Sequence, residues 1–168
     1  VNYVGVKAGS LVQNIFMVAK LAPIALILVL GLFAGKQSPS LSPIPEGGVT
    51  AGGFIGMVAF ATVASLWAYE GWTNLNIVSE EIRNPKKNLP LALMIAISGC
   101  ALLYTLFNFS IYRVLPMDQI TSMIGEGNIY LGTEAAKQVL GSAGKIVVVI
   151  AMATAIFGSL NGCILVFP

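Results

Sequence analysis

The sequence predicts an all-α membrane protein with four transmembrane helices, the second of them broken. Of its 168 residues, 57% are hydrophobic and only 10% are charged, whereas about a quarter of the residues in a soluble globular domain are charged. The apolar residues gather into long runs, of about the twenty residues that a helix needs to cross about 30 Å of hydrocarbon. Polar residues enter the second run before it is complete, and this predicts the break.

The four expected spans are separated by three connections of different character. The first connection reads KQSPSLSPIPEGG, and its three prolines and two glycines predict an exposed loop. The second reads SEEIRNPKKNLP, where Pro90 suits the first position of the third helix. The spans cover residues 11–35, 53–79, 91–115 and 146–168.

The third connection contains GTEAAKQVLG, which predicts a short surface helix over residues 133–141. Thr133 is expected as its N-cap, Glu134 lies at its positive end, and Gly141 suits its stop.

Positive charge gives the orientation of the spans. Each side of the membrane would carry four Lys or Arg residues, but three of them crowd into residues 83–87. This density favours a cytoplasmic location for the second connection.

Lys20 is an ionisable residue near the middle of the first span. A charge at that depth costs roughly 3 kcal/mol on insertion scales, so Lys20 is expected to face protein or a water-filled cavity, with a role in function or in an ion pair. The alternative is a lysine whose ammonium group extends to an interface, but from this position the distance is long.

Glu70 and Gly71 stand where the second span turns from apolar to polar. On an unbroken helix the carboxylate would need a buried partner, whereas at an interruption it can face water, and Gly71 allows the chain to unwind. In the alternative, the span ends near Tyr69, and the neighbouring tryptophans form an interfacial aromatic belt. Residues 53–69 number only 17, which is short for a span and favours the break.

The fourth span contains FGSLNGCIL, which places Ser159 and Asn161 among apolar residues. Gly158 and Gly162 have the Gly-x-x-x-Gly spacing that lets a neighbouring helix approach closely. Asn161 could also offer its amide to an ion, a substrate or Lys20. The same spacing occurs at residues 31 and 35 and at residues 52 and 56, so the spacing alone does not identify a contact.

Three stretches are distinctive: VKAGSLVQNIFMVAKLAPIALILVLGL, WAYEGWTNLNIVSEEIRNPKKNLPLAL and FGSLNGCIL. Together they resemble the amino acid–polyamine–organocation (APC) transporters, and within them the L-type amino acid transporters and the bacterial serine/threonine exchangers. The resemblance covers nearly the whole chain and implies a LeuT-type fold of two inverted five-helix repeats. The four spans would be helices five to eight of a twelve-helix protein. The chain starts at Val1 and stops at Pro168 in its last apolar run, so we expect a fragment.

The resemblance implies a substrate site between the broken first and sixth helices, of which this chain holds the sixth. Backbone carbonyl groups at the break would hold the α-amino group of an amino acid, and the Trp67 indole would close over it as a gate. Glu70 stands where a small or apolar residue is common, and it either favours a cationic substrate or only bonds inside the cavity. The implied substrate-binding residues are Trp67, Ala68, Tyr69, Glu70, Gly71, Thr73 and Asn74.

Lys20 matches a lysine in the fifth helix of sodium-independent members, where its ammonium group replaces the sodium ion of related symporters. Ser159 and Asn161 would face that region from the eighth helix. The resemblance therefore implies sodium-independent exchange by alternating access in the cell membrane, with residues 80–90 cytoplasmic and residues 133–140 an extracellular lid. The expected partners are an amino acid, membrane lipid and the rest of the transporter chain, and an accessory subunit is left open.

Other classes fit less well. The net charge of +2 does not favour nucleic acid, and without His, a nucleophile–base pair or a metal-ligand cluster the sequence predicts no enzyme, cofactor or metal site. Two alternatives remain open. One is a proton-coupled amino acid or polyamine permease of the same fold, in which Glu70 or Lys20 titrates. The other is a structural accessory membrane subunit, which would bind no substrate.

Overall fold

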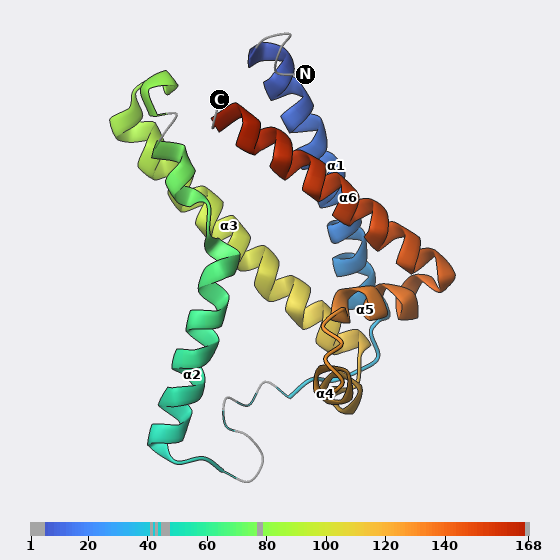
Figure 1. Ribbon diagram of the computed structural model, residues 1–168. Coiled ribbons are helices and arrows are strands. Elements are labelled where there is room, and N and C mark those ends of the chain that lie inside the picture. The colour runs from blue at the N-terminus through green and yellow to red at the C-terminus, as the bar shows by residue number, and fades with distance from the viewer. Residues whose placement is uncertain (1–5, 41, 43, 45–47, 77–78, 167–168) are drawn as a thin grey trace. The chain divides into compact units, whose positions relative to one another are not determined.

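The computed structural model of the chain describes residues 6–40, 42, 44, 48–76 and 79–166. Within these ranges every regular element is a helix, as the sequence predicts (Figure 1). Four segments are long and apolar enough to cross a membrane: Leu11–Ala34, Ala51–Asn74, Pro85–Val114 and Ser142–Ile164. The α-helices are α1 (Val6–Ala34), α2 (Ala51–Leu66), α3 (Pro85–Val114), α4 (Met117–Gly125), α5 (Leu131–Leu140) and α6 (Ser142–Val166), and the 3-10 helices are η2 (Trp67–Tyr69), η3 (Trp72–Asn76) and η4 (Ser79–Glu81).

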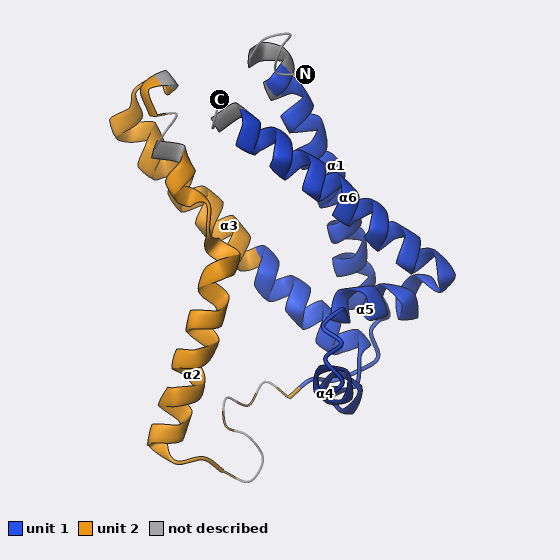
Figure 2. Cartoon of the chain, in the orientation of Figure 1, with its two compact units in different colours: residues 1–39, 103–168 blue, residues 40–102 orange. Residues whose placement is uncertain are grey.

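The chain forms two compact units, and each is described by itself (Figure 2). Unit 1 comprises Val1–Pro39 and Leu103–Pro168, and unit 2 comprises Ser40–Leu102, so α3 contributes to both. The first connection carries no helix or strand at its described positions, as its prolines predict. Outside the described residues lie positions 41, 43 and 45–47 of that connection, 77–78 of the expected second span and 167–168 of the fourth.

α1 and α6 lie side by side in unit 1 and run antiparallel (Figure 1). A Cβ added to Gly162 would lie 3.2 Å from Gln13 Nε2, and one added to Gly158 would lie 3.2 Å from Phe16 Cβ. The rings of Phe16 and Phe157 stack, with centroids 6.0 Å apart and an interplanar angle of 11°. The glycine spacing in the fourth span therefore does mark a close helix contact.

The end of α1 packs against the last turns of α3. A Cβ on Gly31 would collide with the Ser110 hydroxyl, and one on Gly35 would lie 2.7 Å from both Cβ and O of Arg113. Ser110, which is only 1% exposed, donates a hydrogen bond of 3.3 Å from its hydroxyl to the Ile27 carbonyl. Arg113 donates from Nη2 to the Gly35 carbonyl at 2.7 Å. This second glycine pair is thus also a contact between helices.

The hydrophobic core of unit 1 lies where the end of α3 meets α4 and α5. Leu115, between α3 and α4, is only 1% exposed. The sequence did not predict α4, which buries Ile120 and Met123 and carries Asp118 in its first turn, at the positive end of the helix. The buried cluster comprises Ile111, Val114, Leu115, Ile120 and Ala135, with Phe107, Leu131 and Val139 packed against it.

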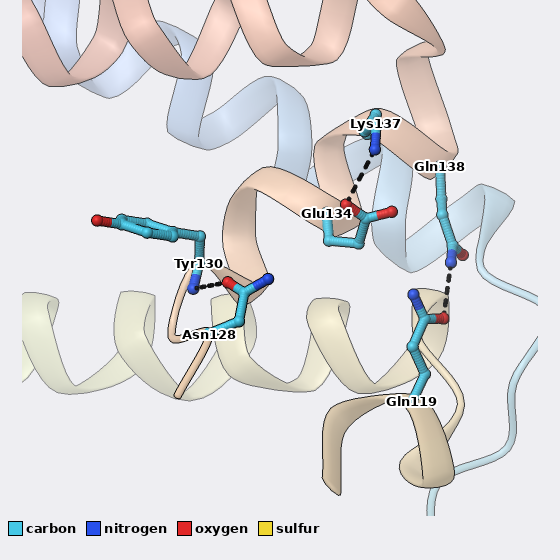
Figure 3. Close-up of polar contacts among 6 residues, drawn as sticks. All are labelled: Gln119, Asn128, Tyr130, Glu134, Lys137 and Gln138. Carbon is cyan, nitrogen blue, oxygen red and sulfur yellow. Dashed lines mark hydrogen bonds and ion pairs between the residues drawn. The ribbon is translucent and has the colours of Figure 1, made fainter. Parts of the chain in front are cut away.

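α5 begins two residues before its predicted start, so the assignment of Thr133 as N-cap is wrong. The N-cap residue is Tyr130, whose N–H donates to Asn128 Oδ1 at 3.1 Å (Figure 3). The Tyr130 carbonyl accepts from the N–H groups of Thr133 (3.0 Å) and Glu134 (3.2 Å). Thr133 therefore lies inside the first turn, because the chain reversal at Asn128 already starts the helix.

Figure 3 shows two polar side-chain contacts of α5, the first with α4 and the second within α5. Gln138 Nε2 donates to Gln119 Oε1 of α4 at 3.0 Å, and Lys137 pairs with Glu134 at 3.3 Å. Gly141 ends the helix with a φ of +62°, as predicted, because glycine adopts this conformation without strain.

In unit 2, α2 begins at Ala51 and is capped by Thr50, whose hydroxyl accepts from the Gly53 N–H at 3.2 Å. None of its residues is buried. Gly52 and Gly56 have no atom within 4 Å of an added Cβ, so among the described residues of unit 2 this third glycine pair makes no helix contact.

α3 begins earlier than expected, so the placement of Pro90 as its first residue is wrong. Pro85 holds that position, and Pro90 lies inside the helix. Asn84, with a φ of +53°, turns the chain into the helix, and its carbonyl accepts from the N–H groups of Lys87 (3.1 Å) and Asn88 (3.0 Å). Pro85 fits the first position because its missing N–H would have had no partner there in any case.

Candidate functional site

The second transmembrane helix is interrupted at Glu70 and Gly71, which confirms the predicted break. The α-helix ends at Leu66 and tightens into η2, after which Glu70 is extended, with φ −67° and ψ 152°. Gly71 has a φ of +107°, a conformation that L side chains rarely adopt. A Cβ at Gly71 would meet no atom within 4 Å. Gly71 is therefore required for its backbone conformation and not for space.

One backbone hydrogen bond closes a turn on each side of the break. The Glu70 N–H donates to the Trp67 carbonyl at 3.2 Å, and the Asn74 N–H donates to the Gly71 carbonyl at 3.2 Å. Each closes a 3-10 turn rather than an α-turn, so the helix does not run through. A helix that ends in this way presents carbonyl groups and partial negative charge, which suit an ammonium group.

The side chains at the break are open to their surroundings within unit 2. Trp67 is 80% exposed, which leaves its indole free to pack against a ligand or another segment. The Glu70 carboxylate is exposed and accepts no hydrogen bond from the described residues. Ala68 and Thr73 are also exposed, and Tyr69 and Asn74 are half-buried. A carboxylate beside free helix ends can bind a cationic group.

Lys20 lies in α1, about one turn beyond Phe16, whose ring stacks on that of Phe157 in α6. It follows Phe16 by four residues, so the two side chains share a helix face, and Lys20 is half-buried there. Among the described residues it makes no hydrogen bond or ion pair. The expectation that Lys20 faces protein or a water-filled cavity stays a prediction.

Asn161 contacts α1 through its amide. Its Nδ2 donates to Gln13 Oε1 at 3.0 Å and to the Gly9 carbonyl at 3.5 Å. The sequence analysis did not predict Gln13 as a partner, although one signal was present. Gln13 is an amide residue near the start of the first apolar span, and Asn161 is one near the end of the fourth. Ser159 is exposed and does not share this contact.

The candidate residues fall into two groups. The break from Trp67 to Asn74 belongs to unit 2, whereas Lys20, Ser159 and Asn161 belong to unit 1. Within unit 1, Asn161 contacts Gln13 and Gly9, and no hydrogen bond or ion pair joins Lys20 to Ser159 or Asn161 among the described residues. In the part of the chain that the structure describes, no three His, Cys, Asp or Glu residues could hold a metal ion.

Comparison with known proteins adds independent evidence. The family model for amino acid permeases matches residues 1–168. The chain is 38% identical over 122 residues to b(0,+)-type amino acid transporter 1 of Homo sapiens, which covers 71% of this chain and 24% of that protein. It is 32% identical over 174 residues to the serine/threonine exchanger SteT of Bacillus subtilis, which covers 100% of this chain and 36% of that protein.

A more distant relative is the large neutral amino acids transporter small subunit 2 of Mus musculus, 28% identical over 178 residues that cover 96% of this chain and 30% of that protein. No solved structure gives a significant match. The chain thus spans about a quarter to a third of the length of these curated relatives, which are transporters and not enzymes. Because the family model matches the chain from end to end, and SteT aligns with all of it, this chain belongs to the amino acid permease family.

Proposed function

We propose that the chain forms the fifth to eighth helices of an amino acid transporter of the LeuT-type fold. The transporter exchanges amino acids across the cell membrane without sodium, by alternating access. The interrupted helix at Glu70 and Gly71 carries this proposal, because non-helical backbone at membrane depth is tolerated only where it is buried in protein or lines a cavity. The names of the permease relatives, two of which specify amino acids and one an exchanger of serine and threonine, support the substrate class.

In this proposal the break binds the substrate. Carbonyl groups at the end of η2 accept hydrogen bonds from the α-amino group, and the exposed Trp67 indole closes over the bound amino acid. Thr73 and Asn74 line the pocket for the substrate side chain. Glu70 lies at the same place, so its carboxylate either meets a cationic substrate or binds water beside it.

Lys20 acts as a fixed positive charge in place of a removable sodium ion. A fixed ammonium group cannot dissociate with the substrate, so the transporter gains no energy from a sodium gradient and exchanges one amino acid for another. Residues 80–90 lie in the cytoplasm in this arrangement, and α5 is an extracellular lid.

Transport assays on the full-length protein in liposomes test the proposal. We expect uptake of a labelled neutral amino acid only when the liposomes contain unlabelled amino acid, and the same rate when choline replaces sodium. Uptake into empty liposomes that responds to a proton gradient would instead support a proton-coupled permease. The ionisable Glu70 at the break and the half-buried Lys20 favour that second candidate. A full-length protein that binds no amino acid would support an accessory role and refute both.

A further inference from the structure

One end of the contact between α1 and α6 combines three independent interactions within about two helical turns. The amides of Gln13 and Asn161 are joined by a hydrogen bond of 3.0 Å. Phe16 stacks on Phe157. Gly158 brings the backbone of α6 so close that its added Cβ would lie 3.2 Å from Phe16 Cβ. We call these five residues the amide seam.

The amide seam is costly to open in a membrane. Gln13 and Asn161 lie inside the segments Leu11–Ala34 and Ser142–Ile164, both of which are apolar enough to span a bilayer. Each lies a few residues from an end of its segment, and if the helices separated there, the two amides would lose each other as partners. Asn161 would also lose its contact with the Gly9 carbonyl.

The amide seam also fixes the rotation of α1 about its own axis, one to two turns from Lys20. Gln13, Phe16 and Lys20 are spaced by three and four residues, so they share one face of α1, and Gln13 and Phe16 contact α6 from it. Rotation of α1 about its axis, or a slide along α6, would break the hydrogen bond between Gln13 and Asn161. Such a rotation would also turn Lys20, on the same helix face, away from its half-buried position.

We propose that Gln13 and Asn161 are positioning residues that keep α1 and α6 together as one body throughout transport and so hold Lys20 in place. This inference rests on the proposed function. It gives Asn161 a role different from the ion or substrate contact that its sequence position suggests, because its amide N–H groups are directed to α1. The conformational change must then occur elsewhere than at this contact.

A disulfide across the amide seam tests whether the two helices separate. Disulfide bonds need Cβ atoms about 3.5–4.5 Å apart, and the 3.2 Å between Phe16 Cβ and a Cβ added at Gly158 reaches this range after a small outward shift. The full-length variant Phe16→Cys/Gly158→Cys, with Cys100→Ser and Cys163→Ser in the background, is oxidised in liposomes. We expect the disulfide to form and the oxidised protein to keep at least half of the exchange rate of the reduced protein. Loss of exchange on oxidation with recovery on reduction, or failure of the disulfide to form, would overturn the proposal.

A second set of variants tests the positioning role without a crosslink. Asn161→Leu should lower the exchange rate at saturating substrate at least tenfold, while the KM stays within twofold, because the substrate site is intact. The exchanged pair Gln13→Asn/Asn161→Gln can restore the hydrogen bond and should recover at least half of the rate. An exchanged pair no better than Asn161→Leu would refute the role of the contact. If the unmodified protein exchanged no amino acid, the proposed function would fail, while disulfide formation would still test the contact.

Discussion

Gly144 provides a quantitative test of the corner between α5 and α6. An added Cβ would lie 2.7 Å from the Lys137 N and closer still to the carbonyl of Ala136, which is fully buried. These are backbone atoms of α5, and they cannot rotate away as a side chain could. To reach even the 3.4 Å at which ordinary contact begins, α5 and α6 must move apart.

The variant Gly144→Ala should therefore destabilise the full-length protein. Overpacking costs about 1–3 kcal/mol, and a collision with backbone belongs at the upper end. The higher helix propensity of alanine offsets at most about 1 kcal/mol, so we expect a net loss of about 2 kcal/mol. Thermal unfolding of the purified protein in detergent, followed by tryptophan fluorescence, measures the loss as a lower melting temperature.

Gly132→Ala is the matched control, because an added Cβ on this α5 residue would lie 3.9 Å from the nearest atoms, two carbons of the Phe107 ring. It should leave the melting temperature unchanged or raise it slightly, since alanine favours the helix without a collision. If Gly144→Ala melted at the same temperature as Gly132→Ala, the packing argument would be wrong.

Four further predictions concern the other contacts. Arg113→Gln removes a charged donor to the Gly35 carbonyl and should cost about 2 kcal/mol in the same melting assay, and an unchanged melting temperature would contradict this. Gly71→Ala should slow exchange roughly 5- to 30-fold, because a φ of +107° strains alanine by about 1–2 kcal/mol; a rate equal to that of the unmodified protein would show that the break tolerates a side chain. Lys20→Ala should strongly reduce turnover in liposomes, and unchanged exchange would remove Lys20 from the mechanism. The 168 residues reconstituted alone should not transport, since the first broken helix is expected elsewhere, and measurable exchange would disprove this.

The features that depend on composition and on local backbone were predictable from the sequence. The four long helices follow from runs of apolar residues, and the structure confirms them. The break was predictable because Glu70 and Gly71 are both unsuited to an uninterrupted apolar helix, one by charge and the other by backbone freedom. The stop at Gly141 follows from the same backbone freedom.

The features that depend on distant partners were not predictable. Three glycine pairs share one spacing, yet only two of them meet another helix among the described residues of their own unit, because the partner is fixed by the fold and not by the spacing. The predicted first residues of two helices were wrong for a more local reason. Thr133 and Pro90 are both suitable first-turn residues, but Tyr130 and Pro85 precede them and already start the helices. The short helix α4 was missed because its signal in the sequence is weak. It consists only of two apolar residues three positions apart, Ile120 and Met123, among polar residues.

The contact between Arg113 and the end of α1 has a practical consequence for protein engineering. Besides the bond from its side chain to the Gly35 carbonyl, Arg113 accepts a hydrogen bond at its own carbonyl from the Gln37 N–H at 2.9 Å. Hydrogen bonds to Arg113 therefore hold the chain at Gly35 and at Gln37, on both sides of Lys36 and before the proline-rich connection begins. An epitope tag inserted a few residues beyond Gln37 would lengthen that connection without pulling on α1, which makes it a suitable site for labelling the intact protein.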